Sequence, residues 1–381
     1  MPANGHIAAR HPAIALSFSI FTSADPMQPG PYLAEYLSYQ LGNKSDSGVL
    51  MLIQSETFHE VNHHAQSLSS WPQEYDQLTA GRFEGFLQDV HFDAVRLFRE
   101  RMNQGVAQHT HTPAGQIALL IPIHLDGSKT SDQARSVLAN GITLLPCDED
   151  FFFVGPPDTD YTVISLQQDQ MSGLLNEEDY ETLLKARRSH GLQVKPQWLQ
   201  QVRIAMLNLL EQLNDDSQAL TEQQTIQKEK ALRDQLLLMA LEIYTGSMDS
   251  NPLQKSARPL GNQHHYIVRR CHDFALSDEG ATASVLDMCK QLGIARRTLN
   301  YSFARVTGTS PAQYLRAVKL NAARRQLHTS HLSVTAVAAN VGFFHTGYFS
   351  QEYRRLFGET PTATRAGGAR RASPVICSPA Q

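Results

Sequence analysis

Two segments in the C-terminal third of the chain share one layout, and this duplication limits the fold more than any other feature. They are Ser284–Pro311 and Ser333–Pro361. In each, a short apolar stretch with helical spacing is followed by a glycine, an apolar residue, and a second amphipathic stretch that ends at Gly and then Pro. A glycine between two short helices permits the positive φ of a tight turn. Each segment is therefore predicted to be a helix-turn-helix, and residues 310–327 are predicted to form the helix that connects them.

The charge of the chain is divided unevenly around this module. Residues 264–381 carry 15 Lys+Arg and 6 Asp+Glu, a net charge of +9, whereas residues 1–263 carry a net charge of −13. A glycine-linked helix pair is common, but two copies in a basic module indicate a polyanionic partner. Because the second helix of such a unit can enter the major groove, double-stranded DNA is the expected partner.

The stretch from Ser284 to Arg365 resembles the DNA-binding domain of the AraC family of bacterial transcription regulators. The matching positions are "LGI" at 292–294, Leu299, Phe303, Gly308, Pro311, Tyr314, Leu315, "GF" at 342–343, "YFS" at 348–350, Tyr353, Gly358, Pro361 and Arg365. The resemblance implies a cytoplasmic bacterial regulator, most simply an activator, that recruits RNA polymerase. Ala295 and His345 depart from the family, which usually has Ser and Asp or Asn there. Since Ala cannot accept first-turn N–H bonds, we expect no side-chain cap at Ala295.

The outward positions of the two second helices are the candidate DNA contacts. In the first helix, Leu299, Phe303 and Val306 are expected in the core, which leaves Arg296, Arg297, Asn300 and Tyr301 outward. In the second, Phe349, Tyr353 and Leu356 are expected in the core, which leaves Thr346, Ser350, Gln351, Arg354 and Arg355 outward. Arg suits guanine and Asn suits adenine. The resemblance places Arg297, Asn300 and Tyr301 at base-reading positions, and Thr346, Ser350 and Gln351 are expected near bases. Arg296, Arg354 and Arg355 are expected on phosphates; the alternative is a solvated basic face.

The chain ahead of the basic module begins with short apolar or alternating runs. They lie at 49–55, 86–92, 95–101, 116–123, 142–146, 150–155 and 161–166. Short strands bounded by turn residues predict a sandwich or barrel. Residues 71–104 also resemble the sensor region of the AraC-family regulators of ethanolamine operons, which implies a cupin-like β domain. Such a domain is expected to hold a small-molecule effector of unknown identity in its interior.

A helical pattern follows these runs. Apolar residues recur at spacings of three or four, and a short polar link divides them, so residues 197–245 are predicted to form an antiparallel helical hairpin. Two readings stay open for it: the interface of a homodimer, or packing against its own β domain.

With 381 residues, the chain is expected to hold more than one domain. The predicted fold class is α+β multidomain, with a β-rich, cupin-like sensor that ends in the hairpin and an all-α domain with two helix-turn-helix units. The predicted boundaries are an irregular tail at 1–30, the sensor at 31–245, a linker at 246–263, the DNA-binding domain at 264–365 and a flexible tail at 366–381.

The remaining features argue against an enzyme. His109 and His111 have the H-x-H spacing of cupin metal sites, but Gly115 and Gln116 stand where a Glu is needed, so neither a metal nor another cofactor is predicted. The alternative is a cupin-type metalloenzyme that carries a DNA-binding module. The four cysteines form no C-x-x-C pair, which fits a reducing cytoplasm. No run of 18 apolar residues exists, so no membrane span is expected.

Overall fold

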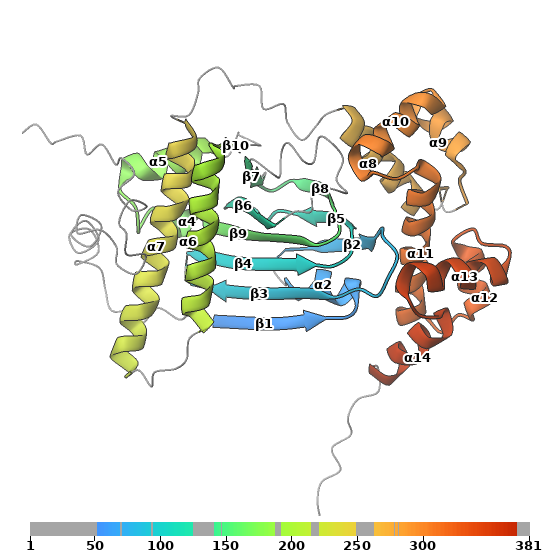
Figure 1. Ribbon diagram of the computed structural model, residues 1–381, viewed down its shortest axis with the longest axis horizontal. Coiled ribbons are helices and arrows are strands. Elements are labelled where there is room, and N and C mark those ends of the chain that lie inside the picture. The colour runs from blue at the N-terminus through green and yellow to red at the C-terminus, as the bar shows by residue number, and fades with distance from the viewer. Residues whose placement is uncertain are drawn as a thin grey trace, which may run out of the picture. The chain divides into compact units, whose positions relative to one another are not determined.

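The computed structural model describes residues 52–68, 71–92, 94–124, 141–145, 147–186, 192–214, 221–248, 263–277, 279–280 and 282–371. The predicted tail at 1–30 and almost all of the predicted linker lie outside these residues. Within them, a two-sheet β domain with attached helices precedes an all-α domain (Figure 1). The predicted fold class is thus confirmed.

The larger sheet has seven antiparallel strands in the order β1-β3-β4-β9-β6-β7-β10. In chain order these strands are β1 (Leu52–Phe58), β3 (Gly85–His91), β4 (Val95–Met102), β6 (Gln116–His124), β7 (Gly141–Leu145), β9 (Thr159–Gln167) and β10 (Leu192–Gln193). Every run predicted as a strand overlaps a strand; residues 49–51 of the first run lie outside the described residues.

The smaller sheet has three strands in the order β2-β5-β8, namely β2 (Gln73–Gln77), β5 (Val106–His111) and β8 (Asp150–Gly155). Helix α2 (Val61–Ser67) lies against β2 and β3. The sequence predicted β8 but neither β2 nor β5, since both carry many polar residues. The space between the sheets is filled by a buried cluster that includes Trp71, Tyr75, Phe98 and Phe153.

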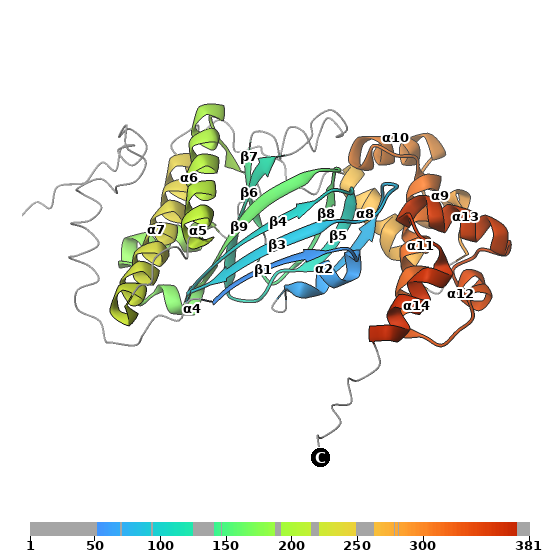
Figure 2. The ribbon, with the colours of Figure 1, turned by 60° about the horizontal axis from the view of Figure 1, so that its bottom comes forward.

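The outer face of the seven-stranded sheet is covered by helices. Alternate residues such as Leu97, Leu119 and Ile164 point to this face and join a second apolar cluster. The helices are α4 (Gln168–Met171), α5 (Glu177–Ala186), α6 (Pro196–Asn214) and α7 (Glu222–Met248). Figure 2 shows α6 and α7 side by side on this sheet. The predicted hairpin therefore packs on its own β domain, which was one of its two readings.

The all-α domain contains seven helices within the described residues: α8 (Gln263–Leu276), α9 (Val285–Leu292), α10 (Arg296–Thr307), α11 (Pro311–Thr329), α12 (Val334–Asn340), α13 (Thr346–Phe357) and α14 (Pro361–Arg371). Helix α14 continues past Arg365, where the domain was predicted to end. No helix among the described residues combines the length and the apolar character that crossing a membrane requires.

Candidate nucleic-acid interface

Helices α9 and α10 form the first helix-turn-helix unit. Ser284 and Asp287 make a capping box at the start of α9, and Gly293 ends it with φ of 62°. That left-handed conformation costs a residue with a Cβ roughly 1–2 kcal/mol, so glycine suits the turn. Ala295 stands at the N-cap of α10 and makes no side-chain hydrogen bond, as predicted.

One face of α10 is buried and the other is open. Leu299, Phe303 and Val306 are buried in a cluster with α8 and α11, as predicted. Arg296, Arg297, Asn300 and Tyr301 are all exposed. Arg305 donates a hydrogen bond of 2.9 Å to the Tyr301 hydroxyl, which fixes the ring at the edge of this face. The open face thus presents two guanidinium groups, an amide and a phenol.

Helices α12 and α13 form the second unit, and the turn between them, residues 341–345, is two residues longer than the turn of the first unit. Gly342 has φ of 83°, and His345 occupies the N-cap of α13 without a side-chain hydrogen bond. Phe349, Tyr353 and Leu356 are buried, as predicted. Thr346, Gln351, Arg354 and Arg355 are exposed and Ser350 is half-buried. The nine candidate residues therefore fall on two open helix faces.

Two aromatic residues beside α13 were not predicted as site residues. Phe344 is 78% exposed and Tyr348 is 46% exposed. The Arg316 guanidinium lies 5.8 Å from the centre of the Tyr348 ring. A large apolar side chain this exposed, next to a polar helix face, is a surface suited to contact with another molecule.

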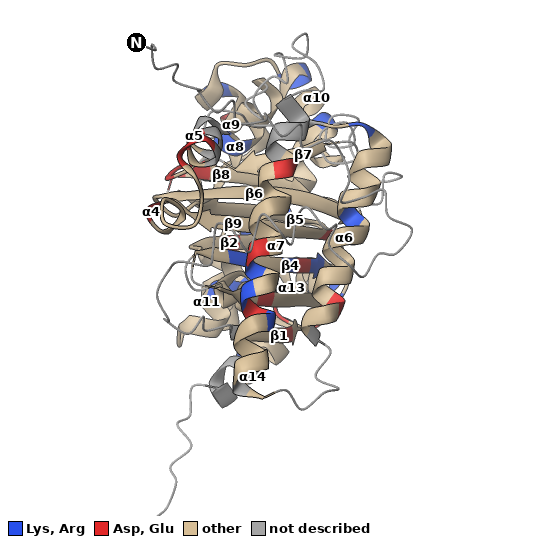
Figure 3. Cartoon of the chain, turned by 90° about the vertical axis from the view of Figure 1, so that its left-hand side faces the viewer, with Lys and Arg blue, Asp and Glu red and all other residues tan. Residues whose placement is uncertain are grey.

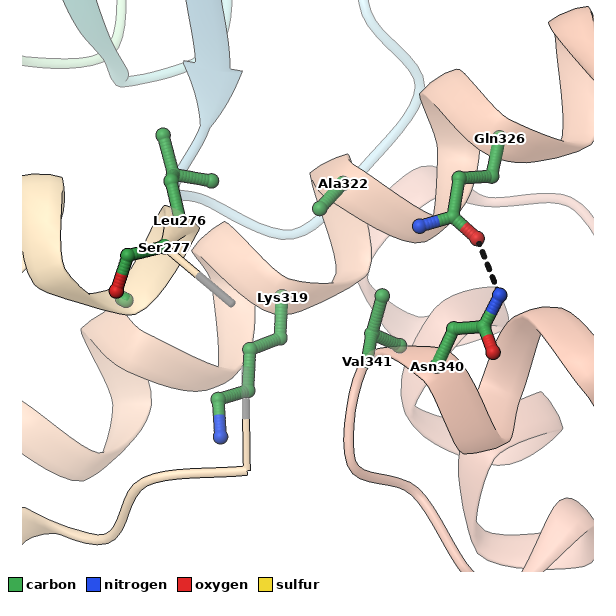
Figure 4. A pocket seen from close by; sticks show the side chains of 8 residues that line it. Leu276, Ser277, Lys319, Ala322, Gln326, Asn340 and Val341 are labelled. Carbon is green, nitrogen blue, oxygen red and sulfur yellow. Dashed lines mark hydrogen bonds between the residues drawn. The ribbon is translucent and has the colours of Figure 1, made fainter. Parts of the chain in front are cut away.

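Helix α11 holds the two units together. Tyr314, Leu315 and Val318 belong to the cluster of the first unit, whereas Leu320 and Leu327 belong to that of the second. A cleft of about 350 Å³ separates the units on one side of α11, and Figure 4 shows Lys319 and Ala322 along it. The Lys319 ammonium donates to the Ala283 carbonyl, and Asn340 donates to Gln326 across the cleft. Both units are thus fixed to one rigid helix.

Another side of α11 docks on the edge of the small sheet. Asn321 is buried; its amide oxygen accepts from the Gln77 backbone N–H at 3.0 Å, and its amide nitrogen donates to the Gln77 carbonyl at 2.9 Å. An edge strand presents such groups unpaired. The Asn321 side chain therefore completes β2 as a neighbouring strand would.

The end of the second recognition helix is bonded to the same part of the sensor. The Gln77 side-chain amide and the Gly81 backbone N–H both donate to the Leu356 carbonyl, each at 2.9 Å. The last carbonyls of a helix lack partners within the helix. The β domain thus supplies donors to the C-terminus of α13.

A buried ion cluster lies beside these bonds. Arg324 donates to both carboxylate oxygens of Glu60, the N-cap residue of α2, and His328 lies 3.3 Å from the same carboxylate. Burial raises the pKa of Glu60, but the hydrogen bonds from His328 and Arg324 outweigh it and hold that pKa well below its usual value. Arg325 donates to Asp76 at 2.6 Å. Both guanidinium groups therefore bind carboxylates of the β domain.

Two histidines meet where α8 packs on the outer face of the small sheet. The His109 and His272 rings are stacked with centroids 4.6 Å apart, and Phe152 packs against both. The His272 Nδ1 atom lies 2.9 Å from the Tyr314 hydroxyl. Burial, with His109 and Arg325 nearby, holds the pKa of His272 well below its usual value. An uncharged His272 therefore suits this interface.

The two histidines of the H-x-H motif have separate roles. His109 faces α8, while His111 pairs with Asp150 at 3.1 Å and with Asp148 at 3.4 Å. Among the residues that the structure describes, no group of three or more His, Cys, Asp or Glu side chains is arranged to hold a metal ion.

Comparison with known proteins bears on the all-α domain. The family model described as a helix-turn-helix domain matches residues 288–367. The regulator ExsA of Pseudomonas aeruginosa is 29% identical over 127 residues, 33% of this chain and 45% of its own. XylDLEGF operon transcriptional activator 2 of Pseudomonas putida is 42% identical over 71 residues, 18% of this chain and 45% of its own. The chain thus spans less than half of the length of these curated relatives.

Two solved structures each match slightly more than a quarter of the chain. An AraC-type transcriptional regulator from Chromobacterium violaceum is 30% identical, covering 27% of this chain and 89% of its own with a TM-score of 0.25. The DNA-binding domain of AdpA, in complex with a target DNA, is 26% identical, covering 29% of this chain and 97% of its own with a TM-score of 0.26. The resemblance of residues 71–104 to ethanolamine-operon regulators stays a prediction. By the family model, residues 288–367 of this chain form a helix-turn-helix domain, and this part of the chain is similar to the transcription regulators named above.

Proposed function

We propose that this protein is a transcription regulator that reads double-stranded DNA with α10 and α13. The observation that carries this is the pairing of two open polar helix faces, each backed by a buried apolar face, on one rigid connecting helix. Such a pair fits two successive major-groove segments about one helical turn (~34 Å) apart.

The exposed residues divide by chemistry. Arg297 and Asn300 suit the acceptor and donor patterns of guanine and adenine, and Tyr301, Thr346, Ser350 and Gln351 complete the base-reading set. The other three arginines, Arg296, Arg354 and Arg355, bind phosphates and fix the register. Arg355 also lies 3.6 Å from Glu352, so part of its charge is compensated within α13.

The β domain acts as the sensor in this proposal. A small-molecule effector shifts the population between the docked arrangement and one in which the DNA-binding domain is released. The interface of Asn321, Glu60–Arg324 and His109–His272 is the element through which the shift is transmitted. In this proposal, promoter-bound protein recruits RNA polymerase.

We also propose that the regulator forms a homodimer. The sheet-facing sides of α6 and α7 are already buried, so a partner would bind another side of these helices. Figure 3 shows acidic residues along the neighbouring α5, where Glu177, Glu178 and Glu181 are exposed. Like charges there would repel a second copy, which favours an interface away from α5.

The test is selection of genomic DNA fragments by the full-length protein at fixed, moderate salt, followed by sequencing. Salt is fixed because phosphate contacts make affinity steeply salt-dependent. The expected result is a motif of two short blocks about ten base pairs apart. Enrichment that is independent of sequence would refute base reading by α10 and α13. Transcription from the selected promoters with purified RNA polymerase then tests activation.

A further inference from the structure

A pocket opens in the sensor where α2, β2, β5 and β8 meet. Its volume is about 490 Å³, within the range of roughly 300–1,000 Å³ typical of small-molecule sites. Leu68, Trp71 and Pro72 give it an apolar side, and Gln73, His109 and Thr110 give it a polar side. It lies at the edge of the space between the sheets, which the apolar cluster around Tyr75 and Phe98 fills.

Four of the residues that line this pocket carry a buried polar atom that has no hydrogen-bond partner among the described residues. The atoms are Trp71 Nε1, Gln73 Nε2, His109 Nε2 and Thr110 Oγ1. The His109 Nε2 atom lies 3.7 Å from the Asp273 carboxylate of α8, which is too long for a hydrogen bond. Buried polar groups are nearly always bonded, and leaving one unpaired costs free energy. His109 points to the opposite face of β5 from Thr110, where it stacks on His272. The other three atoms, on Trp71, Gln73 and Thr110, are those whose partners a ligand in this pocket would supply.

The chemistry of the lining limits what that ligand is. The Trp71 N–H can only donate, and the Thr110 hydroxyl can donate, so the ligand must bring acceptor oxygens. Among the described residues that line the pocket, none is Lys or Arg, and the Glu74 and Asp150 carboxylates border it. An anionic ligand is therefore disfavoured. The Asp150 carboxylate is already paired with His111 and Arg269, so it does not call for a cation.

The walls of the pocket are the elements that hold the DNA-binding domain. Helix α2 carries Glu60, which binds Arg324 and His328. On β5, His109 stacks on His272, and on β8 Asp150 lies 3.4 Å from Arg269 of α8. A molecule bound here touches all three elements. Its binding energy can therefore act on the docking of the domain.

From these observations, we propose that this pocket is the effector site and that it binds an uncharged molecule with hydroxyl or carbonyl oxygens on a hydrocarbon frame. This inference rests on the proposed function, because an effector has meaning only for a regulator. It names the position and the chemical class of a ligand that the sequence left unknown.

The test uses full-length protein with Trp198→Phe, which leaves Trp71 as the sole tryptophan of the two in the chain. Benzyl alcohol, cyclohexanol and acetophenone are titrated against the Trp71 emission, beside their charged counterparts benzoate, cyclohexanecarboxylate and benzylamine. Uncharged compounds are expected to bind and charged ones to bind far more weakly. Thr110→Val should weaken binding by roughly 2- to 10-fold, the effect of one hydrogen bond.

Thr143→Val is the matched control, because the Thr143 hydroxyl is also buried and unpartnered but lies on β7, outside the pocket. Its binding should equal that of the parent. The assignment is overturned if no uncharged compound binds, if the charged compounds bind equally well, or if both threonine variants lose affinity alike. DNA selection is measured on the same protein. If the protein selects DNA but binds no compound, the effector-site assignment is refuted and the proposed function stands. If compounds bind and the Thr110 variant weakens them but no DNA sequence is selected, the proposed function is refuted and the binding site stands.

Discussion

Replacing Glu60 by Gln should loosen the docking of the DNA-binding domain on the sensor. Glu60 and Arg324 are 8% and 7% exposed, so this is a buried ion pair. Breaking such a pair by removing one charge costs about 3–5 kcal/mol. Arg324 keeps Glu359, at 2.8 Å, and the Tyr353 and Thr364 hydroxyls, so the loss falls below that range. We expect about 2–3 kcal/mol, which is roughly a 30- to 150-fold change in the docking equilibrium.

Hydrogen exchange of backbone amides measures the change in the docking equilibrium directly. The Gln77 and Gly81 backbone N–H groups donate across the interface, to Asn321 and to Leu356. If undocking frees them, their exchange should accelerate by the same factor as the equilibrium changes. The amide of Gln still caps α2 through its oxygen, so local fraying of that helix should stay small.

Asp160→Asn is the matched control. The Asp160 side chain is 13% exposed and pairs with Arg99 at 2.7 Å within the sensor, away from α11. This change should lower the stability of the β domain without speeding exchange at Gln77 and Gly81 selectively. Equal acceleration in both variants, or none in Glu60→Gln, would refute the idea that the Glu60–Arg324 pair governs docking.

Three further predictions concern DNA reading, pH and backbone conformation. Arg297→Ala should weaken binding to the selected motif by about 1–3 kcal/mol and relax the base preference at one position. Arg270 is an exposed arginine of α8, and Arg270→Ala should leave the base preference unchanged at every position. Fluorescence anisotropy with single-base variants of the motif distinguishes the two outcomes. Acidification should weaken docking, because burial lowers the pKa of His272 and of His109 below the usual 6.5 and the undocked form therefore binds more protons. The docking free energy should begin to fall as pH drops below about 6.5, with a slope of at most about 1.4 kcal/mol per pH unit for each histidine. The Tyr314 hydroxyl faces His272 and Asp76 lies 3.7 Å away. Burial raises the pKa of Asp76, so protonation of Asp76 favours docking and opposes the effect of the histidines. His272→Gln should therefore reduce the pH dependence of docking in the same hydrogen-exchange assay. An unchanged pH dependence in this variant would show that His272 is not its source. Finally, Gly293→Ala should lower the melting temperature, since its φ of 62° disfavours a side chain. Gly347→Ala should raise the melting temperature, because a Cβ there meets open space and Ala favours the helix by up to about 1 kcal/mol of unfolding free energy. Thermal unfolding of both variants checks the opposite signs.

Local patterns were enough to predict the helix-turn-helix units. Each glycine turn, each buried triad and each open face follows from spacing within about thirty residues, and the exposure of Arg297 and Asn300 is as predicted. The strands with continuous apolar runs, such as β6, were equally clear. The hairpin was found, but a choice between packing on its own sheet and pairing with a copy depends on contacts that no local pattern contains.

The missed strands and the docking contacts share one physical cause. β2 and β5 look polar because one face of each meets the DNA-binding domain, where Asp76 binds Arg325 and His109 stacks on His272. A polar residue that is buried against another domain cannot be told from one that faces water. Glu60 and Arg324 are 264 residues apart, and their pairing follows only from the assembled fold. The pocket beside α2 was missed for the same reason.

The pairing of Asn321 with the edge of β2 also bears on solubility and self-association. While the domain is docked, the Gln77 N–H and C=O groups are occupied. Release of the DNA-binding domain would leave β2 as an unpaired edge strand, which can pair with a strand from another polypeptide. In the proposed mechanism, the signal that releases the DNA-binding domain therefore also exposes an unpaired strand edge, and the undocked protein should aggregate unless another molecule covers that edge.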